Sequence, residues 1–159
     1  MRRYIINGID YSREPDSITW GQFEQYVHEL LDCAIDQGQW EIHRQCPRMY
    51  IDGGARRLDW HITEKRQGGI AVVVDAKHFR RGPLPRREID DTEFYRRQAR
   101  ARQALIVASY ETNIPLSVSE YSKQIGVKII KLEEHINMRI VLKKYFDYIL
   151  TSSWENRYY

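Results

Sequence analysis

The apolar positions of the chain recur at two different spacings, which separate helical from extended segments. A three- and four-residue spacing, typical of amphipathic helices, runs through residues 19–35 and again through residues 133–150. Thr19 and Gln22 fit a capping box at the start of the first of these segments. Two further helices complete the expected set of four: a polar one at about residues 88–103 and a short one at residues 115–126.

Alternating and wholly apolar runs predict five strands. Residues 56–63 alternate between apolar and polar side chains, as in a strand with one buried face. Residues 70–74 are apolar without interruption and open a central strand, 70–79, that is covered on both faces. The other expected strands are residues 39–47, 104–110 and 127–132. This order of elements predicts a three-layer α/β/α sandwich around a mixed central sheet, antiparallel through its first hairpins and completed by crossovers.

One domain is the expectation for a chain of 159 residues. We divide it into an N-terminal arm at residues 1–16, a core at residues 17–134, and a C-terminal helix and tail at residues 135–159. The apolar stripe of the last helix is most simply part of the core, although a terminal helix of this kind can also serve a dimer.

Charge is unevenly distributed along the chain. The 25 Lys and Arg residues against 22 Asp and Glu residues give a net charge of only +3, which argues against nucleic-acid binding by the molecule as a whole. Between Lys77 and Arg102, however, nine basic residues stand against four acidic ones. This local field suits a polyanion, and a solvated helix face with internal salt bridges is the open alternative.

Several functional classes are not expected from this sequence. Cys33 and Cys46 stand alone, so neither a zinc knuckle nor a disulfide framework is predicted. The sequence has no glycine-rich phosphate loop, and we expect no nucleotide cofactor. It also has no segment of the length and apolarity of a membrane span and no apolar signal segment, so we expect a soluble protein of the cytoplasm.

Three charged side chains are predicted to converge where the central strand ends. If residues 56–79 form a hairpin with its turn near Gln67, residues pair when their numbers add to about 134, and Asp59 faces Asp75 at about 5 Å between Cβ atoms. Lys77 shares the face of Asp75, because side chains on a strand repeat every two residues. Two facing carboxylates repel each other unless a cation or a proton lies between them.

A hard divalent cation such as Mg²⁺ suits this arrangement, because it is held by a few carboxylates together with water. Lys77 would then orient or deprotonate a water molecule, or stabilise charge that develops on a phosphate. The alternative is a structural ion pair of Asp75 with Lys77 or with Arg57. Asp52 competes with Asp59 for the neighbouring strand position, although the two glycines after Asp52 indicate a turn.

The first helix offers one further acid. At about 100° per residue, Glu24 falls at the edge of the apolar arc that includes Trp20. Its carboxylate can therefore look along the sheet toward the two aspartates. An ordinary glutamate at the boundary of the buried face is the alternative.

The order of these motifs resembles the PD-(D/E)XK nuclease superfamily, whose fold is called restriction-endonuclease-like. The residues that carry the resemblance are Glu24 on the first helix, Asp59 on the second strand and the D-A-K run that ends the third. W-G-Q-F-E, at residues 20–24, is similar to a helix start in the Mrr-type restriction endonucleases, and residues 104–134 resemble the closing half of that family's core. The chain departs from the family in having Asp75 in place of the commoner Glu or Gln.

The resemblance implies an endodeoxyribonuclease that hydrolyses backbone phosphodiester bonds with Mg²⁺, for which Mn²⁺ would substitute. Asp59, Asp75 and the backbone carbonyl of Ala76 would bind the metal. Lys77 would be the catalytic lysine, and Glu24 an auxiliary acid that acts on the metal directly or through water.

Basic residues directly after the central strand suit contact with DNA phosphates, because arginine binds phosphate with two donors at once. An insert rich in proline and arginine, R-R-G-P-L-P-R-R at residues 80–87, supplies most of them. The expected DNA-binding side chains are Arg80, Arg81, Arg86, Arg87, Arg96 and Gln98, the last by resemblance alone. Cutting both strands of a duplex needs two sites, so a homodimer is expected. A Holliday-junction-resolving or repair nuclease of the same fold, and a DNA-binding module without catalysis, remain the alternatives.

Overall fold

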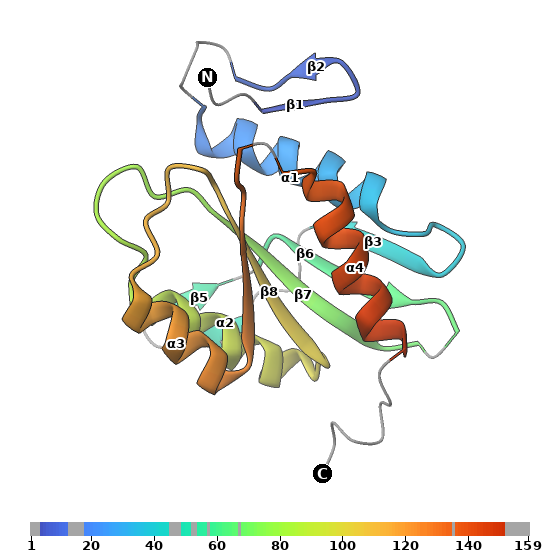
Figure 1. The fold of residues 1–159 in the computed structure, drawn as a ribbon. Helices are drawn as coiled ribbons and strands as arrows, with labels where there is room; N and C mark the ends of the chain where they lie inside the picture. The colour runs from blue at the N-terminus through green and yellow to red at the C-terminus, as the bar shows by residue number, and fades with distance from the viewer. Residues whose placement is uncertain are drawn as a thin grey trace.

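A five-stranded mixed sheet forms the centre of the fold (Figure 1). The computed structural model describes residues 4–12, 18–44, 49–51, 54–56, 58–66, 68–134 and 136–151. The helices are α1 (Trp20–Ala34), α2 (Arg86–Ala99), α3 (Leu116–Ile125) and α4 (Met138–Thr151). The strands are β1 (Ile5–Ile6), β2 (Ile9–Asp10), β3 (Trp40–Arg44), β4 (Met49–Ile51), β5 (Gly54–Arg56), β6 (Trp60–Glu64), β7 (Ile70–Lys77), β8 (Gln103–Ala108) and β9 (Val127–Lys131).

The sheet combines an antiparallel half and a parallel half. Its strand order is β3-β6-β7-β8-β9. β3, β6 and β7 are antiparallel, whereas β8 and β9 run parallel to β7 and are reached through crossovers that contain α2 and α3. The central strand β7 is therefore shared by both halves, and the predicted mixed sheet is confirmed.

Helices cover both faces of the sheet, so the predicted three-layer arrangement is confirmed as well. On one face, α1 and α4 pack against each other and against a core that includes Trp60, Val72 and Val74 (Figure 1). On the opposite face, α2 and α3 pack on a second core that includes Val73 and Ile106. Side chains alternate between the faces along β7, as the two-residue repeat of a strand requires.

The start of α1 is fixed by the predicted capping box. Thr19 Oγ1 accepts a hydrogen bond from the Gln22 backbone N–H at 3.2 Å, and Gln22 Oε1 accepts one from the Thr19 N–H at 2.9 Å. The expected apolar stripe is buried from Phe23 onward, but Trp20 is 41% exposed. Assigning Trp20 to the buried stripe was therefore wrong: its ring packs edge-on against His78 and Phe79 at the rim of the core.

Two short hairpins were not predicted. β1 and β2 form a separate two-stranded sheet within the expected N-terminal arm. Asn7 and Gly8 make its turn with φ values of 52° and 77°, a conformation that asparagine and glycine adopt most easily. β4 and β5 form the second hairpin, and Asp52, the competing acid, lies outside the described residues between them.

The C-terminal helix belongs to the core on the α1 face. Leu142, Phe146 and Ile149 are almost fully buried there, as the apolar stripe predicted. The proposed boundary at residue 135 therefore precedes a helix that shares its core with α1. In the described parts of the chain, no helix is both long enough and apolar enough to cross a bilayer.

Candidate active site at the end of strand β7

The register of the β6–β7 hairpin brings Asp59 beside Asp75. Trp60 pairs with Val74 and His61 with Val73, which is the predicted register. A bulge interrupts the pairing only after Ile62, toward the turn and away from the site. Asp59 itself lies one residue before β6, in a bend, and not within the strand as expected.

Asp75 and Lys77 lie on the α2 face of the sheet and contact each other directly. Lys77 Nζ lies 2.6 Å from Asp75 Oδ2 and 2.7 Å from Glu88 Oε2 of α2. The side chains of Asp75 and Glu88 are each only 8% exposed, and that of Lys77 13%. A buried ammonium group therefore bridges two buried carboxylates.

Asp59 is held by the backbone of β7 and by Asp75. Its Oδ2 accepts a hydrogen bond from the Ala76 N–H at 2.9 Å, and its carboxyl group also shares a hydrogen bond with Asp75. Burial raises the pKa of Asp59, and the charge of Glu24 adds to this effect. Glu24 is half-buried on α1 and lies close enough for its charge to reach Asp59. Glu24, Asp75 and Lys77 therefore all influence the pKa of Asp59, so the structure brings the four predicted site residues close to one another.

The protonation of the site is set by burial and by the neighbouring charges. Burial, together with the Asp59 carboxylate, raises the pKa of Asp75 to about 8 against the opposing effect of Lys77. Burial alone would lower the pKa of Lys77, but the carboxylates of Asp75 and Glu88 outweigh it and raise that pKa. Lys77 is therefore charged at neutral pH, whereas Asp75 holds a proton for much of the time unless a further cation is present.

The donor set fits a hard cation that keeps part of its water. Asp59 and Asp75 offer carboxylate oxygens, which Mg²⁺ prefers, and a cation beside them would stabilise the charged forms that burial disfavours. Among the described residues, no three Asp, Glu, His or Cys side chains are grouped closely enough to hold a metal ion unaided. Water molecules and a backbone carbonyl would therefore have to complete the coordination. The role of the Ala76 carbonyl stays a prediction.

Glu88 is the site residue that the sequence did not reveal. It lies in the first turn of α2, where an acid stabilises the helix through its dipole. Because this role alone accounts for an acid at that position, the sequence did not indicate the contact with Lys77. The residues between Lys77 and Glu88 contain the proline- and arginine-rich insert, so no strand or helix repeat relates the two positions.

The expected DNA-binding residues differ in exposure and in whether their side chains contact other groups of the protein. Arg80, Arg81, Arg87 and Gln98 are exposed. Arg86 is exposed too, but its guanidinium lies 3.8 Å from the centre of the Tyr121 ring. Arg96 donates hydrogen bonds to both carboxylate oxygens of Glu93 and to the Ala101 carbonyl, so its side chain stabilises the C-terminal end of α2. Contact with DNA stays a prediction for all six.

The end of β7 is also anchored on its opposite face. His78 is buried, with Nδ1 2.8 Å from Ser109 Oγ and Nε2 3.0 Å from the Ile18 carbonyl oxygen. Thr112 Oγ1 accepts a hydrogen bond from the Phe79 N–H at 3.0 Å and lies 2.9 Å from Ser109 Oγ. His78 and Ser109 are therefore scaffold residues, and they fix the strand that carries Asp75 and Lys77.

The raised pKa of Asp75 makes a prediction about stability. Because the folded protein holds the Asp75 proton more tightly than the unfolded chain does, this group favours folding below about pH 4 and loses that contribution as the pH rises to about 8. The amide introduced by Asp75→Asn does not titrate. The free energy of unfolding of this variant relative to wild type should therefore rise between about pH 4 and 8 and then level off.

Urea unfolding at a series of pH values measures this difference. Asp147→Asn is the matched control, since that carboxylate is exposed on α4 and its removal should change the free energy of unfolding little. A flat or falling difference for Asp75→Asn would contradict the assigned protonation.

Comparisons with known proteins give partial structural likenesses. No protein-family model and no curated protein matches the chain. A crystal structure of AF1548, a protein of unknown function, is similar with a TM-score of 0.47 and 16% identity, over 83% of this chain and 71% of that one. The structure of EndoMS in complex with double-stranded DNA is similar with a TM-score of 0.44 and 17% identity, over 79% of this chain and 50% of the other. Neither likeness decides the chemistry of the site.

Proposed function

We propose that the chain is a metal-dependent DNA endonuclease of the PD-(D/E)XK type. The observation that carries this proposal is the contact of Asp59, Asp75 and Lys77 at the end of a central strand. A purely structural ion pair would need one carboxylate beside Lys77. Here Lys77 meets two carboxyl groups and a third lies next to them, so the site has more acidic groups than one lysine needs, and Asp75 keeps a proton unless a further cation is present.

The residues have distinct roles in the proposed reaction. Asp59 and Asp75 would hold a divalent cation, which supplies polarisation of the phosphodiester and activation of water when bound. Lys77 would donate hydrogen bonds to the phosphate as negative charge develops on it. Glu88 would hold the Lys77 ammonium in place, and Glu24 would act on the metal through water.

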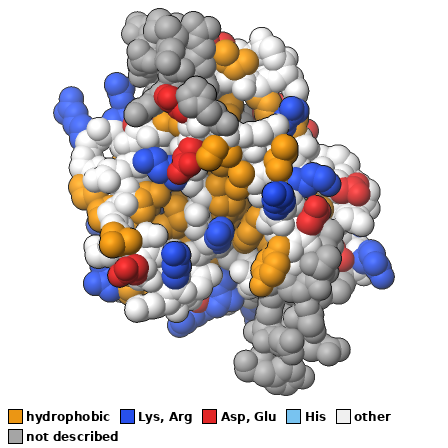
Figure 2. Space-filling view, viewed as in Figure 1, with side chains coloured by type: hydrophobic (Ala, Val, Ile, Leu, Met, Phe, Trp, Pro, Cys, Tyr) orange, Lys and Arg blue, Asp and Glu red, His pale blue; other side chains and the backbone are white. Residues whose placement is uncertain are grey.

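Two surfaces support the proposed partners. Arg80, Arg81 and Arg87 are exposed beside the end of β7 and suit a phosphate backbone. Figure 2 shows apolar side chains gathered over the face of α4 and β9, with lysines and arginines beside them. A groove of about 320 Å³ on this face is lined by Ile130, Val141 and other side chains, and it would serve the second copy of a homodimer.

Cleavage of plasmid DNA tests the proposal. With Mg²⁺ the purified chain should convert supercoiled plasmid to nicked and linear forms, and a chelator should stop the reaction. A branched four-way junction offered beside a linear duplex distinguishes a junction-resolving enzyme from a general one. DNA binding without cleavage under any divalent cation would favour the module that has lost catalysis and would contradict the proposal.

A further inference from the structure

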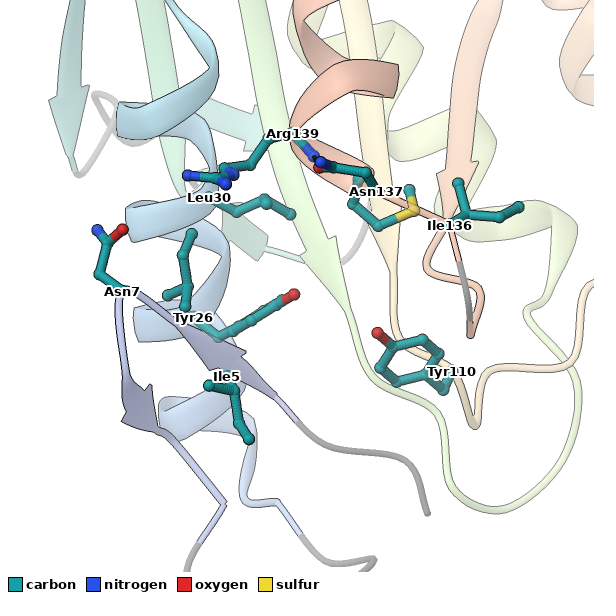
Figure 3. A pocket seen from close by; sticks show the side chains of 10 residues that line it. Ile5, Asn7, Tyr26, Leu30, Tyr110, Ile136, Asn137 and Arg139 are labelled. Atoms are coloured by element: carbon teal, nitrogen blue, oxygen red, sulfur yellow. Dashed lines mark hydrogen bonds between the residues drawn. The ribbon is translucent and has the colours of Figure 1, made fainter.

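A second cavity lies on the face of the sheet opposite to Asp75 and Lys77. It has a volume of about 420 Å³ and opens between the β1–β2 hairpin, α1, the end of β8 and the start of α4 (Figure 3). This volume falls within the range of small-molecule sites, roughly 300–1,000 Å³. The cavity also lies near the carboxyl ends of parallel strands, where open α/β sheets commonly bind ligands.

One end of the cavity offers a hydroxyl donor. Tyr26 is buried, Tyr110 is half-buried, and their hydroxyl groups lie close enough to influence each other. Each phenolic hydroxyl has one hydrogen that it can donate to an acceptor. Figure 3 shows the two side chains reaching toward one another from α1 and from the segment after β8. The pair can therefore donate to a polar atom of a ligand.

The other end of the cavity carries a cation. Arg139, in the first turn of α4, is exposed and extends toward α1 (Figure 3). Within the described ranges its guanidinium has neither a hydrogen-bond nor an ion-pair partner, while its backbone N–H is capped by Asn137 Oδ1 at 3.1 Å. The N-terminal end of a helix adds to the attraction for an anion.

The lining of the cavity has no acidic side chain among the described residues to neutralise Arg139. Two carboxylates lie near Tyr110 without lining the cavity: Glu111, which accepts a hydrogen bond from the Tyr4 hydroxyl, and the exposed Glu134. Apolar side chains of Leu30 and Met138 complete the walls. The cavity thus combines a cation at one end, an apolar middle and a hydroxyl donor at the other end.

We propose that this cavity binds a small organic anion whose ring carries a hydrogen-bond acceptor. The anionic group, a phosphate monoester or a carboxylate, lies against Arg139. The ring packs on Leu30 and Met138 and accepts a hydrogen bond from the Tyr26–Tyr110 pair. This site is separate from the proposed nuclease chemistry and does not depend on it.

Titration of the isotope-labelled full chain, followed by NMR without divalent metal, tests the proposal. The probes are adenosine monophosphate and nicotinate, which pair a ring with phosphate or carboxylate, and adenosine and inorganic phosphate, which each lack one half. At least one complete probe should shift resonances of Tyr26, Tyr110 and Arg139 with an affinity tighter than about 1 mM, and at least about tenfold tighter than either half. Which complete probe binds identifies the anion.

Two variants make the test specific to this cavity. Arg139→Gln removes an exposed charge and should weaken the complete probe at least about tenfold while sparing adenosine. Tyr110→Phe should weaken it by a smaller factor, because one hydrogen bond is lost. Failure of both complete probes to bind more tightly than adenosine and phosphate, no effect of Arg139→Gln, or shifts centred on Asp75 and Lys77 would each overturn the proposal.

Discussion

Asp75→Asn is expected to abolish Mg²⁺-dependent DNA cleavage, by about 10³-fold or more, while the fold is retained. The substitution keeps the shape of a side chain that is 8% exposed and removes the charge that would hold the metal. An amide is a much weaker ligand than a carboxylate for a hard cation. Calorimetric titration with Mg²⁺ or Mn²⁺ should show the loss of metal binding in the same variant.

The stability of the variant separates this result from misfolding. Because burial already disfavours a charged Asp75, asparagine should leave the free energy of unfolding at pH 8 equal to or above that of wild type. Asp147→Asn, on the exposed side of α4, should cleave DNA like wild type. Cleavage by Asp75→Asn at the wild-type rate would contradict the assignment of the site.

The second large effect is expected from Lys77→Met, on stability as well as on cleavage. Methionine fills much of the same space but leaves Asp75 and Glu88 without the ammonium that lies 2.6 and 2.7 Å from them. Breaking a buried ion pair from one side costs about 3–5 kcal/mol. We expect a loss of this size in the free energy of unfolding at pH 8, together with a loss of cleavage of about 10²-fold or more.

The destabilisation should shrink at low pH, where Asp75 holds a proton and leaves no unpaired charge. Urea unfolding of Lys77→Met at pH 5 and pH 8 measures this difference. Adding Glu88→Gln removes a buried carboxylate that Lys77→Met leaves without its ammonium partner, so the double variant should recover part of the stability lost at pH 8 but none of the cleavage. An equal loss of stability at both pH values, or no recovery in the double variant, would show that Lys77 acts by packing alone.

The hairpin that carries the site could be predicted because its determinants are local. The alternation around Trp60 fixed which side chains share a face, and the turn after Glu64 fixed the register. The bulge after Ile62 lies between the turn and the site, and the pairs on the site side still follow the predicted sum. Local repeats of this kind also gave the four helices and the mixed sheet.

Other features depend on contacts between distant segments and could not be read from local repeats. Glu88 meets Lys77 because α2 packs back onto β7 after the insert. Trp20 continues the helical stripe in sequence, but none of the described elements covers that end of α1 fully. The β4–β5 hairpin has only three residues in each strand, too few for an alternation to be recognised.

The shared position of β7 has a consequence for the order of folding. The antiparallel partner of β7, β6, is joined to it by a short connection, so their pairing closes a small loop, whereas β8 can pair only after the longer crossover through α2 has formed. We expect the hairpin to bring Asp59 and Asp75 together early, before α2 delivers Glu88 to Lys77. The folding chain would then pass through a stage in which Asp59 and Asp75 are already together but Glu88 does not yet contact Lys77.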